Sequence, residues 1–152
     1  LADLAFGRPA EADLVNHLRE ADAIILSLVA VQNDELVGHV LFSPATITAA
    51  DGRVAPAVAL GPIAVHPDHQ KQGIGGQLIN EGLARLKTAG HTTVVLLGHP
   101  TYYPRFGFIP ASQLGITSEY DVPDEVFMAQ QLNPATHAST GLAQYHPAFA
   151  NV

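Results

Sequence analysis

Hydrophobic runs separated by short polar turns predict β-strands in the first half of the chain. Residues 24–31 and 36–42 are apolar runs of strand length, and the polar residues 32–35 between them are typical of a hairpin turn. His39 lies inside the second run, and we expect it on the less buried face of that strand, without a catalytic role. Together the two runs predict an antiparallel hairpin.

A third apolar run follows a second turn. Residues 49–53 (AADGR) carry the turn signal, and residues 54–65 form a long strand-like segment that contains Gly61 and Pro62. Because proline donates no ladder hydrogen bond, we expect a bulge or an unpaired position at this step. The segment is therefore predicted to be a strand that is interrupted near its end.

Residues 74–89 show the periodicity of an amphipathic helix, with Gly90 placed to end it. Residues 92–97 are a short apolar run typical of a buried parallel strand, so the three segments predict a right-handed strand–helix–strand unit. A short helix is expected over residues 102–106, ended by Gly107. The residues expected on the buried face of the long helix are Ile74, Leu78, Ile79, Leu83 and Leu86.

The residues between the third run and the helix carry the most specific motif. Ile63, Ala64 and Val65 end the strand, Pro67 stops it, and residues 70–76 (QKQGIGG) open the helix. A glycine-rich turn at a helix start presents backbone N–H groups and the positive end of the helix dipole to an anion. The sequence therefore predicts a phosphate-binding loop.

Two common phosphate-binding motifs do not fit these residues. A P-loop requires a lysine after its last glycine, and none follows Gly75 or Gly76. A dinucleotide-binding fingerprint would use Gly73 and Gly75, but Leu78 occupies its third glycine position. The spacing that does fit is Q-x-x-G-x-G, beginning at Gln70.

This spacing resembles the acyl-CoA pyrophosphate loop of the Gcn5-related N-acetyltransferase (GNAT) family. Residues 103–108 (YPRFGF) resemble the Y-x-x-x-G-F segment of the same family, and the order and spacing of both segments agree across the middle third of the chain. The resemblance implies an α/β (α+β) protein with the GNAT fold, in which a central mixed, twisted sheet of about six to seven strands is flanked by helices. Residues 1–152 would form a single acyl-CoA N-acyltransferase domain.

The resemblance also implies what the two ends of the chain form. Residues 1–6 read as the end of a helix and Pro9 as the start of another, so the first edge strand of the family is expected to be missing. Residues 126–132 and 142–145 are expected to be strands that pair as a hairpin beside the acceptor site. An exposed sheet edge at these strands would suit a homodimer.

Composition and charge narrow the classes of function. The chain is 47% hydrophobic and 14% charged, as expected of a globular protein. Its formal net charge of −7, with seven Lys and Arg residues, argues against nucleic acid as a partner. No apolar run approaches the roughly 18 residues of a membrane span. The chain has no cysteine, which excludes thiolate chemistry and fits a cytoplasmic protein.

The activity that the resemblance implies is acetyl transfer from acetyl-CoA to a primary amine of a small-molecule or peptidyl acceptor, without a metal. The amine attacks the thioester carbon directly, an oxyanion forms, and CoA leaves as a thiolate. A free strand edge can bind the pantetheine amides, and a backbone N–H there can stabilise the oxyanion. The residues expected to bind the cofactor are Ile63, Ala64, Val65, Gln70, Lys71, Gln72, Gly73, Ile74, Gly75 and Gly76.

Tyr103 stands where the family has its general acid, which protonates the leaving thiolate, and Tyr102 is the alternative one residue away. The general base is open among His66, His69 and His99, or a carboxylate acting through water.

A His66-x-Asp68-His69 metal site is disfavoured, because ligands packed into one turn rarely converge. A non-catalytic acyl-CoA-binding or sensor module is the alternative to an enzyme, and the presence of both Tyr102 and Tyr103 favours the enzyme.

Overall fold

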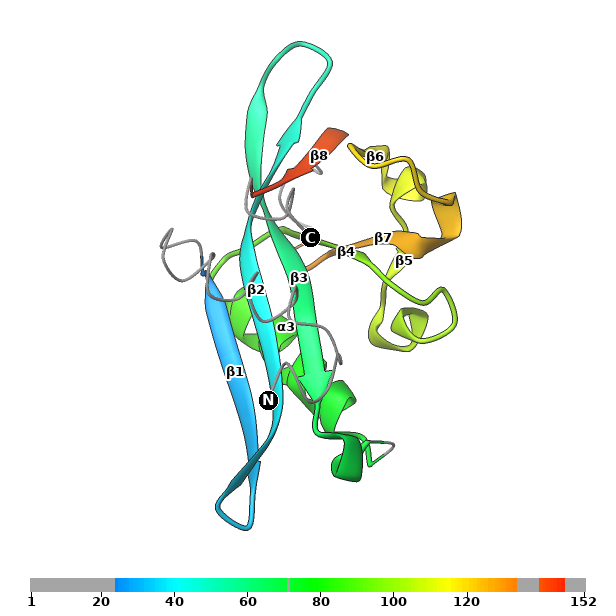
Figure 1. Cartoon of the computed structure of the whole chain (residues 1–152). Coiled ribbons are helices and arrows are strands. Elements are labelled where there is room, and N and C mark those ends of the chain that lie inside the picture. Colours follow the sequence, from blue (N-terminus) through cyan, green and yellow to red (C-terminus); the bar gives the residue numbers. More distant parts are fainter. Residues whose placement is uncertain (1–23, 71, 134–139, 147–152) are drawn as a thin grey trace. The chain divides into compact units, whose positions relative to one another are not determined.

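The computed structural model describes residues 24–70, 72–133 and 140–146 (Figure 1). The helices expected near residues 1–6 and Pro9 lie outside these ranges. None of the helices in the described ranges has the length and apolar character needed to cross a bilayer. The elements in chain order are β1 (Leu26–Gln32), β2 (Glu35–Thr48), β3 (Val54–Val65), η1 (Pro67–His69), α3 (Ile74–Thr88), β4 (Thr93–Leu97), η2 (Tyr103–Phe106), β5 (Ile109–Pro110), η3 (Ala111–Leu114), β6 (Ile116–Ser118), η4 (Asp124–Val126), β7 (Phe127–Gln131) and β8 (Gly141–Tyr145).

The chain divides into two compact units, and β2, β3 and α3 each contribute residues to both. That residues 1–152 form a single domain stays a prediction. The first unit comprises Leu1–Ser43, Leu60–Leu83 and His146–Val152, and the second comprises Pro44–Ala59 and Ala84–Tyr145.

In the first unit, β1 and β2 form the predicted antiparallel hairpin, with Leu26 opposite Phe42 and Gln32 opposite Glu35. Asn33 and Asp34 at its turn have φ values of 53° and 63°. Left-handed backbone at both central residues is the geometry of the two-residue turn that matches the twist of a hairpin, and asparagine and aspartate tolerate it. The turn predicted for residues 32–35 is therefore confirmed.

Helix α3 packs against β2 with the apolar face that the sequence predicts. Its five residues on that face are all buried, and each contributes about 1.5–3 kcal/mol relative to exposure. Two glycines permit the close approach. A Cβ on Gly38 would lie 3.0 Å from both Ile74 Cγ2 and Leu78 Cδ1, and one on Gly82 would lie 2.4 Å from Phe42 Cε2.

His39 is buried, so its expected place on a less buried face is wrong. It is 9% exposed, and its Nε2 lies 2.9 Å from Ser27 Oγ, with which it shares a hydrogen bond. The reason is that residues 37–43 of β2 are all buried, on both faces of the strand. A strand covered on both faces has no exposed side for a polar residue, and a hydrogen bond compensates the burial instead.

In the second unit, β4 is the central strand. It runs parallel to β3 through Val58–Val94 and Ala59–Val95, and antiparallel to β7 from Thr93–Gln131 to Leu97–Phe127. The described pairing of β3 with β4 thus lies ahead of Gly61 and Pro62, whose peptide bond is cis. β5 pairs with β7, while β8 pairs with β2 and, in parallel, with β6. The residues of the core here include Ala45, Ile47, Ala57, Ala59, Val95, Ala111, Ile116, Phe127, Ala129 and Ala143.

The strand pairings confirm a mixed sheet, and they correct one expectation. Hydrogen-bonded neighbours run in the order β5-β7-β4-β3-β2-β8-β6, with β1 paired to β2, which makes eight strands in the described residues. The final two long strands, β7 and β8, were expected to pair as a hairpin, and this is wrong. β7 takes β4 and β5 as partners, and β8 takes β2 and β6. Each of the two strands finds its partners elsewhere in the sheet.

Candidate active site

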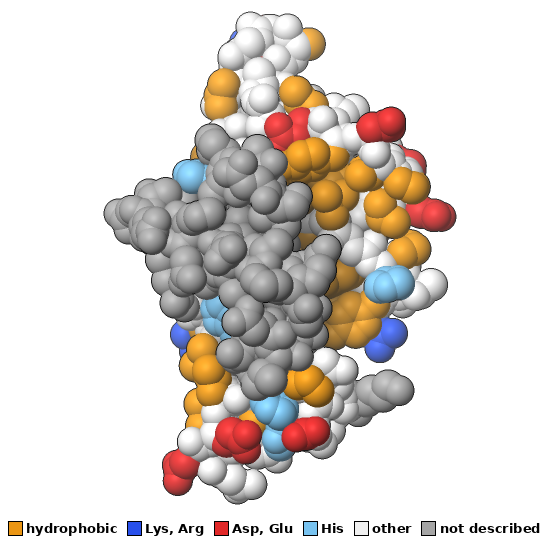
Figure 2. Space-filling model, in the orientation of Figure 1, with side chains coloured by type: hydrophobic (Ala, Val, Ile, Leu, Met, Phe, Trp, Pro, Cys, Tyr) orange, Lys and Arg blue, Asp and Glu red, His pale blue; other side chains and the backbone are white. Residues whose placement is uncertain are grey.

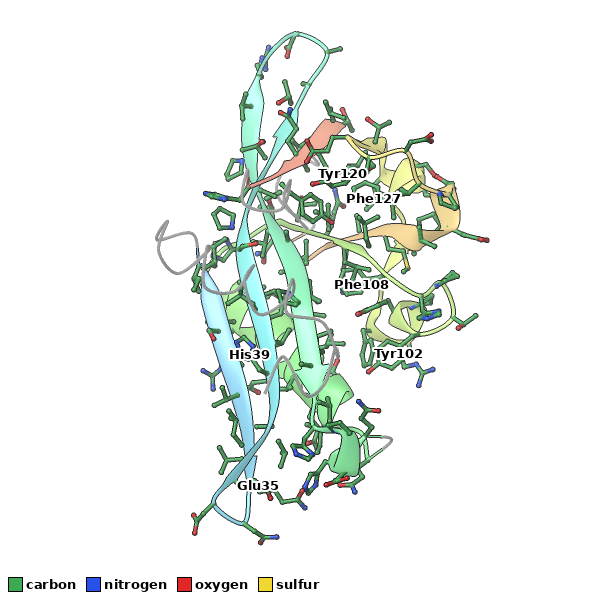
Figure 3. All side chains as sticks on the ribbon, in the orientation of Figure 1. Glu35, His39, Tyr102, Phe108, Tyr120 and Phe127 are labelled. Carbon is green, nitrogen blue, oxygen red and sulfur yellow. The ribbon has the colours of Figure 1, made fainter. Side chains whose placement is uncertain are left out.

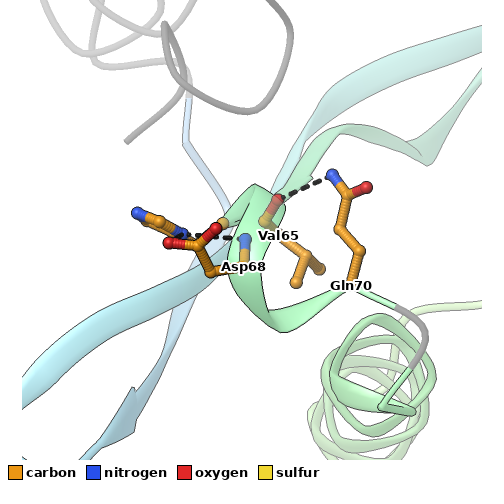
Figure 4. Close-up of polar contacts among 4 residues, drawn as sticks. Val65, Asp68 and Gln70 are labelled. Atoms are coloured by element: carbon orange, nitrogen blue, oxygen red, sulfur yellow. Dashed lines mark hydrogen bonds and ion pairs between the residues drawn. The ribbon is translucent and has the colours of Figure 1, made fainter.

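The predicted phosphate loop lies in the first unit, between the end of β3 and the start of α3. Ala64 is buried, and Ile63 and Val65 are half-buried. The exposed Gln70 side chain turns back on the strand, where its Nε2 donates to the Val65 carbonyl over 3.0 Å (Figure 4). This bond uses one of the two lone pairs of that carbonyl, so a second donor can still bind there.

The start of α3 has the geometry of an anion site. Gln77 N–H donates to Gly73 O over 3.0 Å, which is the first turn of the helix. The N–H groups of Ile74, Gly75 and Gly76 precede this bond and have no acceptor within the helix. Gly73 has a φ of +81°, and a Cβ there would meet no atom within 4 Å. Glycine is therefore favoured at Gly73 by backbone conformation, with open space beside it.

The remaining residues of the loop differ in exposure. Gln72 and Gly73 are exposed, Gly75 and Gly76 are half-buried, and Ile74 is buried against β2. Lys71 lies outside the described residues. The loop thus places exposed and half-buried backbone around the helix start, while one apolar side chain anchors it to the strand.

Two histidines precede the loop. His66 Nδ1 accepts a hydrogen bond from Asp68 N–H over 3.2 Å, and the Asp68 carboxylate oxygen is 3.9 Å from the same nitrogen (Figure 4). Because Nδ1 is already an acceptor, the carboxylate at that distance makes no hydrogen bond with it. The His69 ring lies edge-on to His66, with 5.6 Å between the ring centroids. In the described part of the chain, no three His, Asp or Glu residues are grouped to hold a metal.

The residues present fit the pyrophosphate of a CoA molecule. The start of α3 supplies backbone N–H donors beside open space at Gly73, which an anion can occupy. His69 Nδ1 is buried without a hydrogen-bond partner among the described residues, so it offers a further polar atom just before the loop. The one acidic side chain between Ile63 and Gly76 is Asp68, and it points largely into solvent, 84% exposed.

Tyr103 lies in the second unit, as the first residue of η2, and is 9% exposed. Burial, with a smaller contribution from Tyr102, raises its pKa to about 12. The ring contacts that of Phe108, which is labelled in Figure 3, edge-on at 6.1 Å between the ring centroids. It also lies directly over Gly98, where a Cβ would be 2.3 Å from Tyr103 Cε2. Its phenol is therefore protonated at any physiological pH.

Tyr102 has different surroundings. It is half-buried, and the guanidinium of Arg105 sits 4.8 Å from its ring centroid. Arg105 Nε also donates to the Tyr102 carbonyl over 2.9 Å, and the ring meets Phe106 edge-on at 5.2 Å. Tyr102 thus packs on the outer side of η2 with a cation, while Tyr103 packs inward on a glycine.

Sequence reasoning did not identify Gln130, which lies against the end of η2. Gly107 follows η2 with a φ of +96°, and a Cβ there would be 2.7 Å from Gln130 Nε2. Gln130 sits on β7, opposite Val94 of β4. No local motif around Gln130 could have placed it there, because the contact depends on the pairing of β7 with β4.

The chain is similar in sequence to one family model and to several known proteins. The family model of the GNAT acetyltransferase domain matches residues 1–111. The uncharacterized N-acetyltransferase YjhQ of Escherichia coli K12 is 41% identical over 143 residues, which cover 90% of this chain and 78% of YjhQ. The uncharacterized N-acetyltransferase YhbS of the same strain is 35% identical over 147 residues, covering 95% of this chain and 86% of YhbS.

Two solved structures extend the likeness to the fold. The crystal structure of E. coli YhbS in complex with CoA has a TM-score of 0.90 and 35% identity, covering 99% of this chain and 83% of that one. A GNAT family acetyltransferase from Brucella melitensis, in complex with acetyl-CoA, has a TM-score of 0.78 and 37% identity, covering 97% and 86%. With this family model and these relatives, the chain belongs to the GNAT family of N-acetyltransferases.

Proposed function

We propose that this chain transfers the acetyl group of acetyl-CoA to a primary amine of a small-molecule or peptidyl acceptor. When bound, acetyl-CoA supplies the acetyl group as a thioester. A C–N bond forms and a C–S bond breaks, while the amine gives up one proton and the departing sulfur takes one. A homodimer and a cytoplasmic location stay predictions from the sequence.

The observation that carries the proposal is the N-terminus of α3 directly after β3. Its N–H groups are available to a pyrophosphate, in a chain that is 35% identical over 99% of its length to YhbS, which was crystallised with CoA. The residues proposed to bind the cofactor remain Ile63, Ala64, Val65, Gln70, Lys71, Gln72, Gly73, Ile74, Gly75 and Gly76. Those on β3 would bind the pantetheine arm in the manner of an added strand.

Tyr103 is the proposed proton donor to the leaving sulfur. Its pKa of about 12 keeps the proton available, but it also makes the transfer unfavourable. Against a reference thiol pKa of about 8.5, complete transfer is uphill by about 5 kcal/mol. A turnover of about 10 per second corresponds to a barrier of about 16 kcal/mol, so the step fits within that barrier. Tyr103 then acts chiefly by donating a hydrogen bond to the charge that develops on sulfur.

Exchanging the two tyrosines separately for phenylalanine tests this assignment. Tyr103→Phe keeps the ring against Gly98 and removes the hydroxyl, so kcat should fall by about 100-fold or more while acetyl-CoA still raises the melting temperature. Tyr102→Phe is the matched control and should leave kcat within about twofold. If the loss follows Tyr102 instead, or neither variant loses activity, the role given to Tyr103 is wrong.

A further inference from the structure

An open pocket of about 340 Å³ lies in the second unit, lined by Gly98, His99, Pro100 and Val126. The first three residues follow β4, and Val126 ends η4 just before β7. Gly98 N–H donates to the Val126 carbonyl over 2.9 Å, so one hydrogen bond holds the two walls together. The volume is within the range of small-molecule sites, which starts at about 300 Å³.

The pocket shares a residue with the support of Tyr103. Gly98 lines it, and the Tyr103 ring lies so close to Gly98 that no side chain fits between them. A molecule in the pocket would therefore contact Gly98, against which Tyr103, the proposed proton donor, packs. The main chain at Gly98 is fixed from both sides, by Val126 and by the Tyr103 ring.

The lining is apolar with one polar side chain. Pro100 and Val126 supply hydrocarbon, Gly98 supplies main chain, and His99 supplies an imidazole that can hydrogen-bond an amine. Figure 2 shows hydrophobic side chains gathered on the right of the face drawn, with histidine, carboxylate and cationic side chains at their edge. Such a lining favours a ligand with an apolar body.

Two exposed carboxylates, Asp124 and Glu125, immediately precede Val126 in η4. An alkyl amine is cationic in neutral water, with a pKa of about 10.4, so negative charge beside the pocket raises its local concentration. The combination of an apolar wall and adjacent carboxylates is suited to an amine that carries a hydrocarbon group. It is less suited to a polyamine, whose further charges would lie on the hydrocarbon.

We propose that this pocket is the acceptor subsite and that it selects a primary amine with a compact apolar body, of the arylalkyl or branched-alkyl class. The inference rests on the proposed acetyl transfer and specifies its substrate. Val126 is the residue with which to vary the size of the subsite, because it is the one lining residue with an acyclic hydrocarbon side chain, and Gly98 supports Tyr103.

The test compares phenethylamine with spermidine as acceptors for the full chain, by CoA release. The wild type should use phenethylamine with a kcat/KM at least tenfold higher. Val126→Phe fills the pocket and should raise the KM for phenethylamine at least tenfold, with the KM for acetyl-CoA unchanged. Val126→Ala enlarges it and should raise that KM severalfold, which keeps the test informative if the larger side chain prevents folding. Val54→Phe, at a 62% exposed valine of β3, is the control and should change neither KM.

The outcomes distinguish a failure of the apolar subsite from a failure of acetyl transfer. If spermidine is the better acceptor, or if the Val126 variants behave as Val54→Phe does, acetyl transfer stands and the apolar subsite is overturned. If neither amine releases CoA, although acetyl-CoA raises the melting temperature, the apolar subsite is overturned. The proposed transfer itself fails if other primary amines, including the N-terminus of a peptide, also release no CoA. A phenethylamine preference that the Val126 variants abolish supports both.

Discussion

Gly98 decides how Tyr103 can be placed. A Cβ at this position would lie 2.3 Å from Cε2 and 2.8 Å from Cδ2 of the Tyr103 ring, which is closer than any side chain tolerates. The glycine therefore lets the ring pack closely against the main chain just after β4. That packing buries the phenol, and burial is the main cause of its raised pKa. The absence of a side chain at Gly98 thus contributes to the raised pKa of Tyr103.

The raised pKa of Tyr103 makes stability depend on alkaline pH. The folded protein holds the proton up to a pKa of about 12, whereas the unfolded chain releases it near 10.0. The unfolded state therefore binds fewer protons between these values, and the free energy of unfolding falls as pH rises through them. The stabilisation is fully present below pH 10, and about 1.4 kcal/mol should be lost by pH 11.

Denaturant unfolding of wild type and Tyr103→Phe at pH 8 and pH 11 measures this loss. Burial also raises the pKa of Tyr120 and of Tyr145, so the wild type alone would mix three tyrosines. The free energy of unfolding of the wild type minus that of Tyr103→Phe isolates the contribution of Tyr103. This difference should fall by about 1.4 kcal/mol from pH 8 to pH 11. A difference that stays constant with pH would show that Tyr103 is not buried as described.

At the scale of single residues, the sequence predicts what depends on local motifs and fails where burial depends on distant elements. Tyr103 lies in the short helix and before the glycine where the motif puts it. His39 was misplaced because β2 is covered on both faces, which its short apolar run does not reveal. Gln130 was missed because its contact with Gly107 arises from strand pairing.

Among the secondary-structure elements, the connection from β3 to α3 contains the site proposed to bind the pyrophosphate of acetyl-CoA. The strand ends at Val65, η1 turns the chain, and Gly73 in left-handed conformation starts the helix. An alanine at Gly73 would strain the backbone by about 1–2 kcal/mol. The loop would relax by moving the N–H groups that follow, which are those proposed to bind pyrophosphate.

Gly73→Ala and Gly90→Ala form a matched pair at the two ends of α3. Both glycines have positive φ, +81° and +92°, and a Cβ added to either would meet no atom within 4 Å. Both variants should therefore lose similar stability without ligand. Acetyl-CoA at 100 times its Kd should raise the melting temperature of wild type and Gly90→Ala by roughly 5–10 °C. Gly73→Ala should lose most of that rise, and a full rise would place the anion elsewhere.

Helices and strands were predicted correctly from the sequence where short stretches of residues specify them, and wrongly where distant residues do. The hairpin of β1 and β2, helix α3 and strand β4 were predicted, because periodicity and turn residues mark them. β5 and β6, of two and three residues, were missed because they are too short to show a period. The pairing of β7 with β8 was predicted wrongly, because partner choice depends on the whole sheet and not on the order of strands.

At the scale of the whole molecule, the acidic net charge suits the amine acceptor that an N-acetyltransferase requires. A formal net charge of −7 favours cationic acceptors in general. The anionic cofactor then needs a local site of favourable potential, and the N-terminus of α3 is the site proposed for it.

Acetyl transfer is tested most directly by measuring CoA release from acetyl-CoA, with and without a primary amine, by means of a thiol reagent. The chain has no cysteine, so every thiol detected comes from CoA. Acetyl transfer predicts CoA release that depends on the amine, saturates with it, and equals the amount of acetylated amine formed. Contradiction would come from acetyl-CoA and CoA raising the melting temperature while no amine releases thiol, which would make the protein an acyl-CoA-binding module without transfer.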